Sequence, residues 1–480
     1  MHTRLMHSTR TRSGALLVTL LLVAAACGQK PGVAQVSAGD GLGAGGGAAI
    51  DPATGEALDG AIDPASGEII DGAVDGATGG GTATARTGGT GGAATGGATG
   101  GAAAGGAAVA GDRTGITDTE IRIGIHAPVT GAAPIPQNAF EEGTEVYWKT
   151  PEGKVFSRTV RVFFEDDKFD PATAVQKCKK MVEENKVFVL IGGGGADQIT
   201  ACAKYAQSVG VPYLSAGVNE AGLSNLRSYF ALSTTYSQQS PFLTQLISKQ
   251  FPGKKVGIAV ADSGSFNDAH ASITKAFTGA GFEIVYNKRI PKSANAGDGA
   301  NIANAMQTSG AEVIYFLSSP TTFLYVAAAL NPVYSPQFVG PGITSGLATV
   351  AEIGCQGRKG VDKAIFLSPF PQLDVIDQID PGYQKAYQDQ LGKKGGDLGL
   401  ALWGLSKQLK TMFDAAGKDM TRQSFVTTIE GGTAFAGGVY PPVTYSTRSH
   451  FGGSQVHAVQ ADCSTNPGSY KTIATFVSGF

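Results

Sequence analysis

From residue 120 onward, the pattern of apolar and polar positions switches between two periods, which predicts strands and helices in turn. Short apolar runs such as Ile121–Ile125 and Val187–Ile191 are typical of buried strands. Between these two runs, apolar side chains recur at helical spacing around Cys178. They follow the pair Asp170-Pro171, which is typical of a helix start because Asp caps and proline suits the first helical position.

The same alternation continues along most of the chain. Strands are predicted at 121–125, 160–165, 187–191, 211–214, 255–260, 282–286, 312–316 and 337–339. Helices are predicted near 137–149, 170–185, 199–209, 241–250, 268–280, 299–308, 321–330, 381–390, 399–416 and 422–429, and a β-like segment at 443–459. The β-α alternation runs twice, before and after Ser240. It predicts an α/β fold with parallel sheets covered by helices, in two lobes.

The first residues have the pattern of an export signal. Residues 1–14 contain arginines and no acidic residue, an apolar run covers Ala15–Ala26, and Cys27 follows three alanines. This arrangement resembles the lipobox of bacterial lipoproteins, in which the cysteine becomes the acylated N-terminus. The alternatives are an ordinary signal peptide with an incidental cysteine, or an uncleaved anchor. The run is shorter than the roughly 20 apolar residues of a spanning helix.

Glycine is concentrated between the signal and the first predicted strand. The chain has 69 glycines, and residues 50–61 are nearly repeated at 62–73. This segment has no aromatic side chain to bury, so we expect it to be a disordered tether. A calcium loop is the alternative, but the acidic residues lack EF-hand spacing. We therefore expect a signal peptide at 1–26, a tether at 27–115, one lobe at 116–240 with 367–437, and a second at 241–366 with 438–480.

The cysteines and the charge narrow the classes of protein. A formal net charge of −2 argues against nucleic acid as a partner. Removing Cys27 leaves four cysteines in an exported domain, which indicates two disulfides with three pairings open. Cys178 and Cys202 lie on the inner faces of consecutive helices, so a bridge between them is plausible, and Cys355 would then pair with Cys463. Two buried free thiols at 178 and 202 are the alternative.

No pattern of residues indicates catalysis. There is no G-x-S-x-G motif, no Cys-x-x-Cys or Cys/His cluster of metal-ligand spacing, and the histidines of the body are scattered. We expect no enzyme activity, no metal and no cofactor.

Ligands of open parallel sheets bind beyond the carboxyl ends of the strands, which directs attention to the loops there. The candidate loops are 130–134, 192–197, 215–220, 262–268, 318–319 and 340–342. The second of these runs from four glycines into a helix N-terminus, where backbone N–H groups favour an anion such as a carboxylate. The alternative is that these glycines only permit a tight turn under packed helices.

The order of these stretches resembles a known family. The matching segments are Ile123–Gly131, Glu165–Ala172, Val189–Gly192, Val211–Gly217 and Val256–Phe266. Between about Thr117 and Ala461, the chain resembles the substrate-binding proteins of branched-chain amino-acid ABC transporters, which have the type I periplasmic binding protein fold. The resemblance implies two Rossmann-like lobes that are joined by a three-stranded hinge and close on a ligand.

The resemblance also implies a ligand site. Its carboxylate-binding positions fall near Gly195, Ala196, Gly217 and Asn219, its aromatic cover falls at Phe266, and Ser319 and Gly342 complete the ring from the second lobe. The acid that binds an ammonium in amino-acid-specific members falls near Gly342, where this chain has none. The candidates to replace this missing acid are Glu220 and Asp262. An amide, an organic acid or an aromatic acid is at least as consistent with these positions as a branched-chain amino acid.

Taken with the signal, the resemblance implies a receptor on the outer face of the cell membrane, anchored by lipid at Cys27. We expect it to be a monomer that captures a small solute and delivers it to an ABC permease. The alternative is a lipid-anchored sensory or structural lipoprotein that binds a ligand without transport. An exported enzyme is a more distant alternative.

Overall fold

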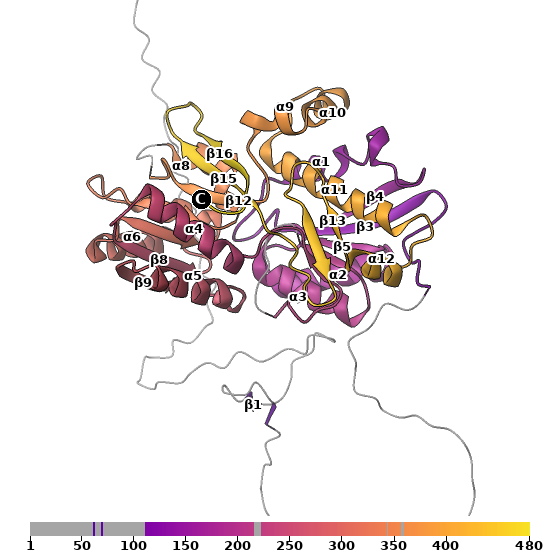
Figure 1. Ribbon diagram of the computed structural model, residues 1–480, viewed down its shortest axis with the longest axis horizontal. Helices are drawn as coiled ribbons and strands as arrows, with labels where there is room; N and C mark the ends of the chain where they lie inside the picture. The colour runs from indigo at the N-terminus through magenta and orange to yellow at the C-terminus, as the bar shows by residue number, and fades with distance from the viewer. Residues whose placement is uncertain (1–60, 63–68, 71–110, 216–221, 343, 357–359) are drawn as a thin grey trace, which may run out of the picture. The chain divides into compact units, whose positions relative to one another are not determined.

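The computed structural model describes residues 61–62, 69–70, 111–215, 222–342, 344–356 and 360–480 (Figure 1). The predicted signal peptide, Cys27 and most of the predicted tether lie outside the described residues. Within the tether, two short strands pair antiparallel, β1 (Ala61–Ile62) and β2 (Ile69–Ile70). β1 spans the junction between the two copies of the tandem repeat, and β2 lies in the second copy.

One sheet has five strands, all parallel. In spatial order they are β4 (Thr159–Asp166), β3 (Glu120–Ala127), β5 (Val189–Gly192), β6 (Tyr213–Ser215) and β7 (Tyr229–Ala231). We call this sheet and its helices lobe 1. Its helices are α1 (Gln137–Val146), α2 (Pro171–Glu183), α3 (Ala196–Ser208), α9 (Ile376–Ile379), α10 (Gly382–Leu391), α11 (Asp397–Ala416) and α12 (Arg422–Ile429).

The second sheet has seven strands and a mixed arrangement. In spatial order they are β16 (Ser469–Val477), β15 (Val456–Asp462), β12 (Ile365–Ser368), β11 (Gln337–Gly340), β10 (Val313–Leu317), β8 (Val256–Ala261) and β9 (Ile284–Ile290). The last five are parallel, and β15 and β16 join antiparallel. We call this sheet and its helices lobe 2, with α4 (Tyr236–Gln250), α5 (Asn267–Gly279), α6 (Ala296–Ser309), α7 (Pro320–Ala329) and α8 (Ala348–Gly354).

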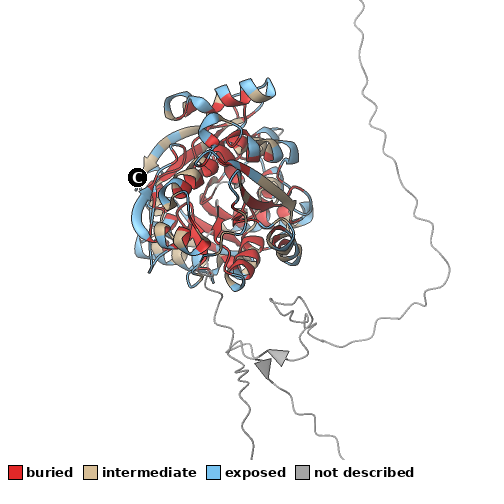
Figure 2. Cartoon of the chain, turned by 90° about the vertical axis from the view of Figure 1, so that its right-hand side faces the viewer, coloured by how far each residue is buried: buried red, intermediate tan, exposed pale blue. Residues whose placement is uncertain are grey.

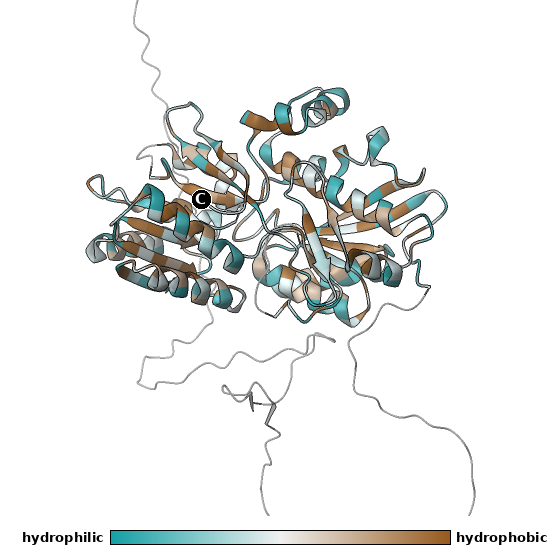
Figure 3. Cartoon of the chain, in the orientation of Figure 1, coloured by the Kyte–Doolittle hydropathy of each residue, from teal (hydrophilic) through white to brown (hydrophobic). Residues whose placement is uncertain are grey.

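Helices cover both faces of each sheet, as the β-α alternation predicts. In lobe 1, α2 packs beside α3, while α1 packs against α11. In lobe 2, α4 packs beside α5 (Figure 1), and α6 packs beside α7. The central strands are almost wholly buried, whereas the edge strands β4, β9 and β16 are partly exposed. The exposed and hydrophilic residues lie mainly on the outer helix faces (Figures 2 and 3). Burial on both faces explains why the central strands are continuous apolar runs rather than alternating ones.

The chain passes between the two sheets three times. It leaves lobe 1 after β7, returns after β12, and leaves again between β14 (Val443–Ser446) and β15. The strand β14 pairs with β13 (Gly431–Phe435) in a two-stranded sheet, and its Tyr445 hydroxyl donates to the carbonyl of Ala231 at 2.7 Å. The backbone N–H of Ala231 donates to the carbonyl of His450. The lobe boundaries stay a prediction, and these contacts favour a last crossing after His450 rather than at residue 438.

Among the sequence predictions that differ from the structure in extent, two have a clear physical reason. The β-like segment predicted at 443–459 is two separate strands, β14 and β15, in different sheets. Helix α4 begins at Tyr236, five residues before the predicted start at Pro241, because Thr235 and Gln238 form a capping box. Pro241 therefore lies inside the helix, where it cannot donate to the carbonyl of Ser237. The hydroxyl of Ser272 on α5 donates to that carbonyl instead, at 3.2 Å.

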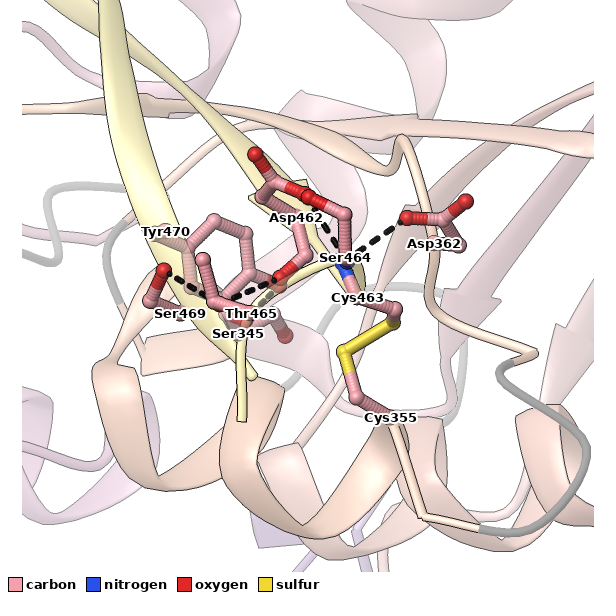
Figure 4. Close-up of a disulfide and its surroundings, with 9 residues drawn as sticks. All are labelled: Ser345, Cys355, Asp362, Asp462, Cys463, Ser464, Thr465, Ser469 and Tyr470. Atoms are coloured by element: carbon pink, nitrogen blue, oxygen red, sulfur yellow. Dashed lines mark hydrogen bonds between the residues drawn. A yellow bond between two sulfur atoms is a disulfide. The ribbon is translucent and has the colours of Figure 1, made fainter. Parts of the chain in front are cut away.

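Both cysteine pairs form disulfides. Cys178 on α2 joins Cys202 on α3 across the inner face of lobe 1, with a Cα–Cα distance of 6.1 Å. Cys355 at the end of α8 joins Cys463 after β15, with a Cα–Cα distance of 5.1 Å (Figure 4). Near the second bridge, the backbone N–H of Cys463 donates to Asp362, and the hydroxyl of Tyr470 donates to the carbonyl of Ser345 (Figure 4). This bridge ties the antiparallel edge of lobe 2 to its helical layer.

Candidate functional site

A cavity lies beyond the carboxyl ends of the strands and is lined by residues of both lobes. Lobe 1 contributes Gly195 and Ala196 after β5, and lobe 2 contributes Phe266 after β8 and Ser319 after β10. These four residues were predicted from the sequence as ligand-binding residues. Within each sheet, the loops are neighbours because each follows a parallel strand, and the carboxyl ends of parallel strands lie at the same edge of the sheet. The cavity lies where these edges of the two sheets face each other.

The N-terminus of α3 forms one wall of the cavity. Gly195 has a φ of 77°, which a side chain rarely adopts, and a Cβ there would lie 2.3 Å from Oε1 of Gln198. No side chain caps this helix. A helix N-terminus carries partial positive charge on free N–H groups, so this wall favours an anionic or hydrogen-bond-accepting group.

Aromatic side chains form a second wall. Phe266 ends a short 3₁₀ turn, η2 (Gly264–Phe266), directly before α5, and its ring centre lies 6.0 Å from that of Tyr236. Tyr236 also lines the cavity. Gly342 does not line it, but a Cβ at Gly342 would lie 2.7 Å from the Tyr236 ring. Gly342 therefore contributes by leaving room for Tyr236 rather than by contact with a ligand.

The other predicted positions have different outcomes. Gly217 and Asn219 lie outside the described residues, as does Glu220. Asp262 is described, but its side chain is 77% exposed and faces Arg289 at 3.6 Å. It does not line the cavity, so nothing in its position supports the predicted role as a substitute for the missing acid.

Two further cavity residues, Phe169 and Lys292, were not among the sequence predictions. Phe169 follows β4 and Lys292 follows β9, and the Lys292 ammonium lies 4.9 Å from the centre of the Phe169 ring. Both loops lie at carboxyl ends of parallel strands, so the rule that selected the other loops also applied to them. Phe169 was overlooked because the acidic residues around it have the pattern of a solvated helix start.

The loop that carries Phe169 has an unusual backbone. Lys168 and Phe169 both have positive φ angles, of 57° and 58°. Their backbone N–H groups donate at 3.0 Å to the side chains of Asp166 and Asp167, respectively. Such conformations cost free energy and persist only where the surroundings impose them. The two carboxylates therefore hold Phe169 in the cavity wall.

Asp167 is in turn held by a buried network. His126 on β3 donates from Nδ1 to Asp167 at 2.8 Å, and its Nε2 accepts from the hydroxyl of Tyr213 at 2.8 Å. We assign this tautomer because a carboxylate can only accept a hydrogen bond, so the ring proton must be on Nδ1. All three side chains are fully buried. Burial raises the pKa of Tyr213 well above its ordinary value, so the phenol remains a donor. This network is a rigid support behind the Phe169 loop.

Asp197, on the first turn of α3, links the two lobes. Its carboxylate accepts from the hydroxyl of Ser263 at 2.6 Å and from the ammonium of Lys292. Burial alone would raise the pKa of Asp197, but the hydrogen bonds from Lys292 and Ser263 outweigh it, so the pKa lies below its ordinary value. Asp197 is therefore ionised at neutral pH, and its bonds to Ser263 and Lys292 join lobe 1 to the loops of lobe 2.

One group of potential metal ligands occurs in the described residues. His126, Cys178 and Cys202 bring ligand-type atoms within 4.8 Å of one another. Both sulfurs are in a disulfide, and both ring nitrogens of His126 are hydrogen-bonded. In this arrangement, the sulfur and nitrogen atoms of the group are therefore not available as ligands of a metal ion.

The family of this chain is shown by its similarity to known proteins. The family model described as periplasmic binding protein matches residues 120–467. The chain belongs to the periplasmic binding protein family. A Leu/Ile/Val-binding protein homolog of Brucella abortus is 27% identical over 216 residues, which is 44% of this chain and 54% of that relative. A homolog from Brucella suis matches with the same identity and coverage. The match thus spans about half the length of these curated relatives.

Solved structures of the family share the fold. A leucine-binding protein of Thermotoga maritima superposes with a TM-score of 0.62 at 14% identity, covering 74% of this chain and 97% of that chain. A solute-binding protein of an ABC transporter from Rhodopseudomonas palustris, solved with 3,4-dihydroxybenzoic acid, gives 0.61 at 17% identity, with 75% and 98% covered. A branched-chain amino-acid transporter protein of Streptococcus pneumoniae, solved with isoleucine, gives 0.60 at 14%, with 74% and 100% covered. The two-lobed type I fold expected from the sequence is confirmed.

In this family member, the structure describes no helix with the length and apolar character needed to cross a membrane. That search covered the described residues, which exclude the predicted signal.

Proposed function

We propose that this chain is an extracytoplasmic solute-binding receptor that captures a small molecule between its lobes and delivers it to an ABC permease. The observation that carries the proposal is the cavity lined by Gly195 and Ala196 from lobe 1 and by Phe266 and Ser319 from lobe 2. A ligand held by both lobes stabilises their closed arrangement, which is the signal a permease can read. We propose no catalytic role for the cavity residues.

Membership of the periplasmic binding protein family supports the proposal. The structural relatives are described with ligands as different as isoleucine and 3,4-dihydroxybenzoic acid, so the fold accommodates several solute classes. For this chain we propose an amino acid, an amide or an organic acid as the solute, and a monomer as the working form.

A thermal-shift screen of the purified full-length protein tests the binding function. A bound solute raises Tm by mass action on the folded state, so at least one amino acid, amide or carboxylic acid should raise it in proportion to the logarithm of its concentration. Phe266→Ala should weaken the affinity for that solute at least tenfold. Phe156→Ala is the matched control, because Phe156 is 39% exposed and does not line the cavity. Equal affinities in all three proteins would place the site elsewhere.

We also propose that the chain is anchored by lipid at Cys27, so that the glycine-rich segment tethers the receptor to the outer face of the membrane. A tether of this length has a root-mean-square reach of roughly 50 Å. Cys27→Ser should move the protein from the membrane fraction to the soluble fraction of the producing cells. Retention of this variant in the membrane would argue against acylation.

A further inference from the structure

The charges of the cavity wall differ from those that an amino acid requires. Among the lining residues that the structure describes, Lys292 is the only charged one, and none is an aspartate or a glutamate. An amino acid carries both a carboxylate and an ammonium. A buried ammonium without a counter-charge is strongly disfavoured, so the ammonium of such a ligand needs an acid, and the described residues of this wall include none.

The nearest described carboxylates are already engaged. Asp197 accepts from Lys292 and Ser263 and is not itself a lining residue. Asp262 faces solvent and Arg289. Among the described carboxylates, Asp197 could bind a ligand ammonium only by releasing Lys292, which exchanges one ion pair for another and leaves the lysine unpaired.

A carboxylate, by contrast, finds several donors. The wall contains the N-terminus of the 13-residue helix α3, which no side chain caps, and the ammonium of Lys292. It also contains Ser318, whose side chain is nine-tenths buried and whose hydroxyl has no partner among the described residues. A buried hydroxyl without a partner is costly, so it indicates a polar group supplied by a ligand.

Most of the remainder of the wall is apolar. Pro134 and Ile135 contribute from lobe 1, and Leu317 and Leu347 from lobe 2, alongside the rings of Phe169 and Phe266. Such a surface gains from the burial of a hydrocarbon chain or an aromatic ring. Its other polar side chains among the described residues are the hydroxyls of Tyr236, Ser319 and Thr349, and none of these is charged.

We infer that the solute is a small monocarboxylate with an apolar body and no ammonium, such as a branched aliphatic or an aromatic acid. The inference rests on the proposed function and narrows its ligand class. The carboxylate lies toward the α3 N-terminus and Lys292, and Ser318 bonds a polar atom of the ligand.

Matched ligands test the inference on the purified full-length protein. Calorimetric titrations compare leucine with 4-methylpentanoate, and phenylalanine with 3-phenylpropanoate, which differ only in the ammonium group. The corresponding amides, 4-methylpentanamide and 3-phenylpropanamide, remove the negative charge instead. We expect a carboxylate to bind at least tenfold tighter than both its amino acid and its amide.

The outcomes separate the two levels of the argument. Tighter binding of the amino acid or of the amide overturns the inference and leaves the receptor function intact. If none of the six compounds binds while the broader screen finds another class of solute, the inference alone fails. If the broader screen also finds no solute, the proposed function fails with it.

A charge introduced into the wall gives a second, independent test. Ser319 caps α7 by accepting from the backbone N–H of Thr322, and Asp and Asn are equally good caps. Ser319→Asp therefore adds a carboxylate to the wall with the cap preserved, and Ser319→Asn is the matched neutral control. Ser319→Asp should weaken carboxylate binding at least tenfold and narrow or reverse the preference over the amino acid, while Ser319→Asn keeps the order of affinities. An unchanged preference in Ser319→Asp overturns the inference.

Discussion

The ammonium of Lys292 lies 4.9 Å from the centre of the Phe169 ring, so that a cation of lobe 2 covers an aromatic side chain of lobe 1. The same ammonium donates to Asp197 on α3. Lys292 therefore contacts two separate elements of lobe 1 from a single position. Both contacts lie at the cavity wall, so they are expected to exist only when the lobes are closed.

Substitution of Phe169 should separate its two contributions. Phe169→Leu keeps an apolar side chain but removes the cation–π contact, which is worth about 0.5–1 kcal/mol, so affinity for the solute should fall about two- to fivefold. Phe169→Ala also removes the apolar wall and should reduce affinity at least tenfold. Calorimetry with the solute found in the screen measures both values. Equal losses for Leu and Ala would show that packing against the ligand contributes nothing.

The Asp197–Lys292 pair should stabilise the closed lobes. Both side chains are about one-quarter exposed, so we expect a coupling of about 1 kcal/mol, near the upper end for partly screened ion pairs. A double-mutant cycle with Asp197→Asn, Lys292→Met and the double variant, scored by solute affinity, measures it. Because the pKa of Asp197 is lowered, the contribution is present at neutral pH and is lost only as the pH falls below about 4, the ordinary range of aspartate.

In that cycle, additive losses at pH 7 would contradict a coupled pair. A coupling that disappeared already between pH 6 and 5 would assign the titration to another group, because Asp197 stays ionised there.

The two disulfides should differ in their contribution to stability. The residues they join are 24 and 108 positions apart, and a bridge that closes a longer loop removes more entropy from the unfolded chain. By loop-closure entropy, the Cys178–Cys202 bridge contributes about 3.5 kcal/mol and the Cys355–Cys463 bridge about 5 kcal/mol. Urea unfolding of the two double Cys→Ala variants measures the difference. A larger loss for the shorter loop would mean that packing of the buried Cys178 and Cys202 dominates over chain entropy.

His457 should make the protein sensitive to acid. This side chain on β15 is fully buried, and burial lowers its pKa from 6.5 to about 4, although Nε2 donates to the carbonyl of Val439 at 3.2 Å. Between pH 6.5 and about 4, the unfolded state takes up a proton that the folded state does not. The free energy of unfolding should therefore fall by about 3 kcal/mol over this interval on account of His457 alone.

The His457→Gln variant isolates this effect, with His270→Gln on the outer helix α5 as the control. The acid-dependent loss of stability should be smaller in His457→Gln than in the wild type, and unchanged in His270→Gln. If the two variants have parallel stability–pH curves, the loss must come from other buried groups.

Most of the β-α order and the choice of cavity loops follow from sequence pattern, although the strands β7, β12 and β16 and the helix α8 were not predicted. Apolar runs of strand length, helical spacing around Cys178 and the Asp170-Pro171 start are local features, and local features predict local structure well. The rule that parallel strands carry ligands at their carboxyl ends then led to Gly195, Ala196, Phe266 and Ser319, all of which line the cavity. Bounds were less well predicted where a cap outside the apolar pattern starts the helix, as Thr235 does for α4.

The tertiary structure alone decided which loops meet and how their charges combine. Phe169 lies in the wall because the Asp166 and Asp167 carboxylates hold a left-handed backbone, and Asp167 is held by His126, 41 residues away in sequence. Lys292 meets Asp197 across 95 residues. Such contacts depend on distances between side chains that the fold brings together from neighbouring strands, as for His126 and Asp167, or from different sheets, as for Lys292 and Asp197. A pattern along the chain contains no information about which charged side chains will share one cavity, and those charges determine which solute the site can hold.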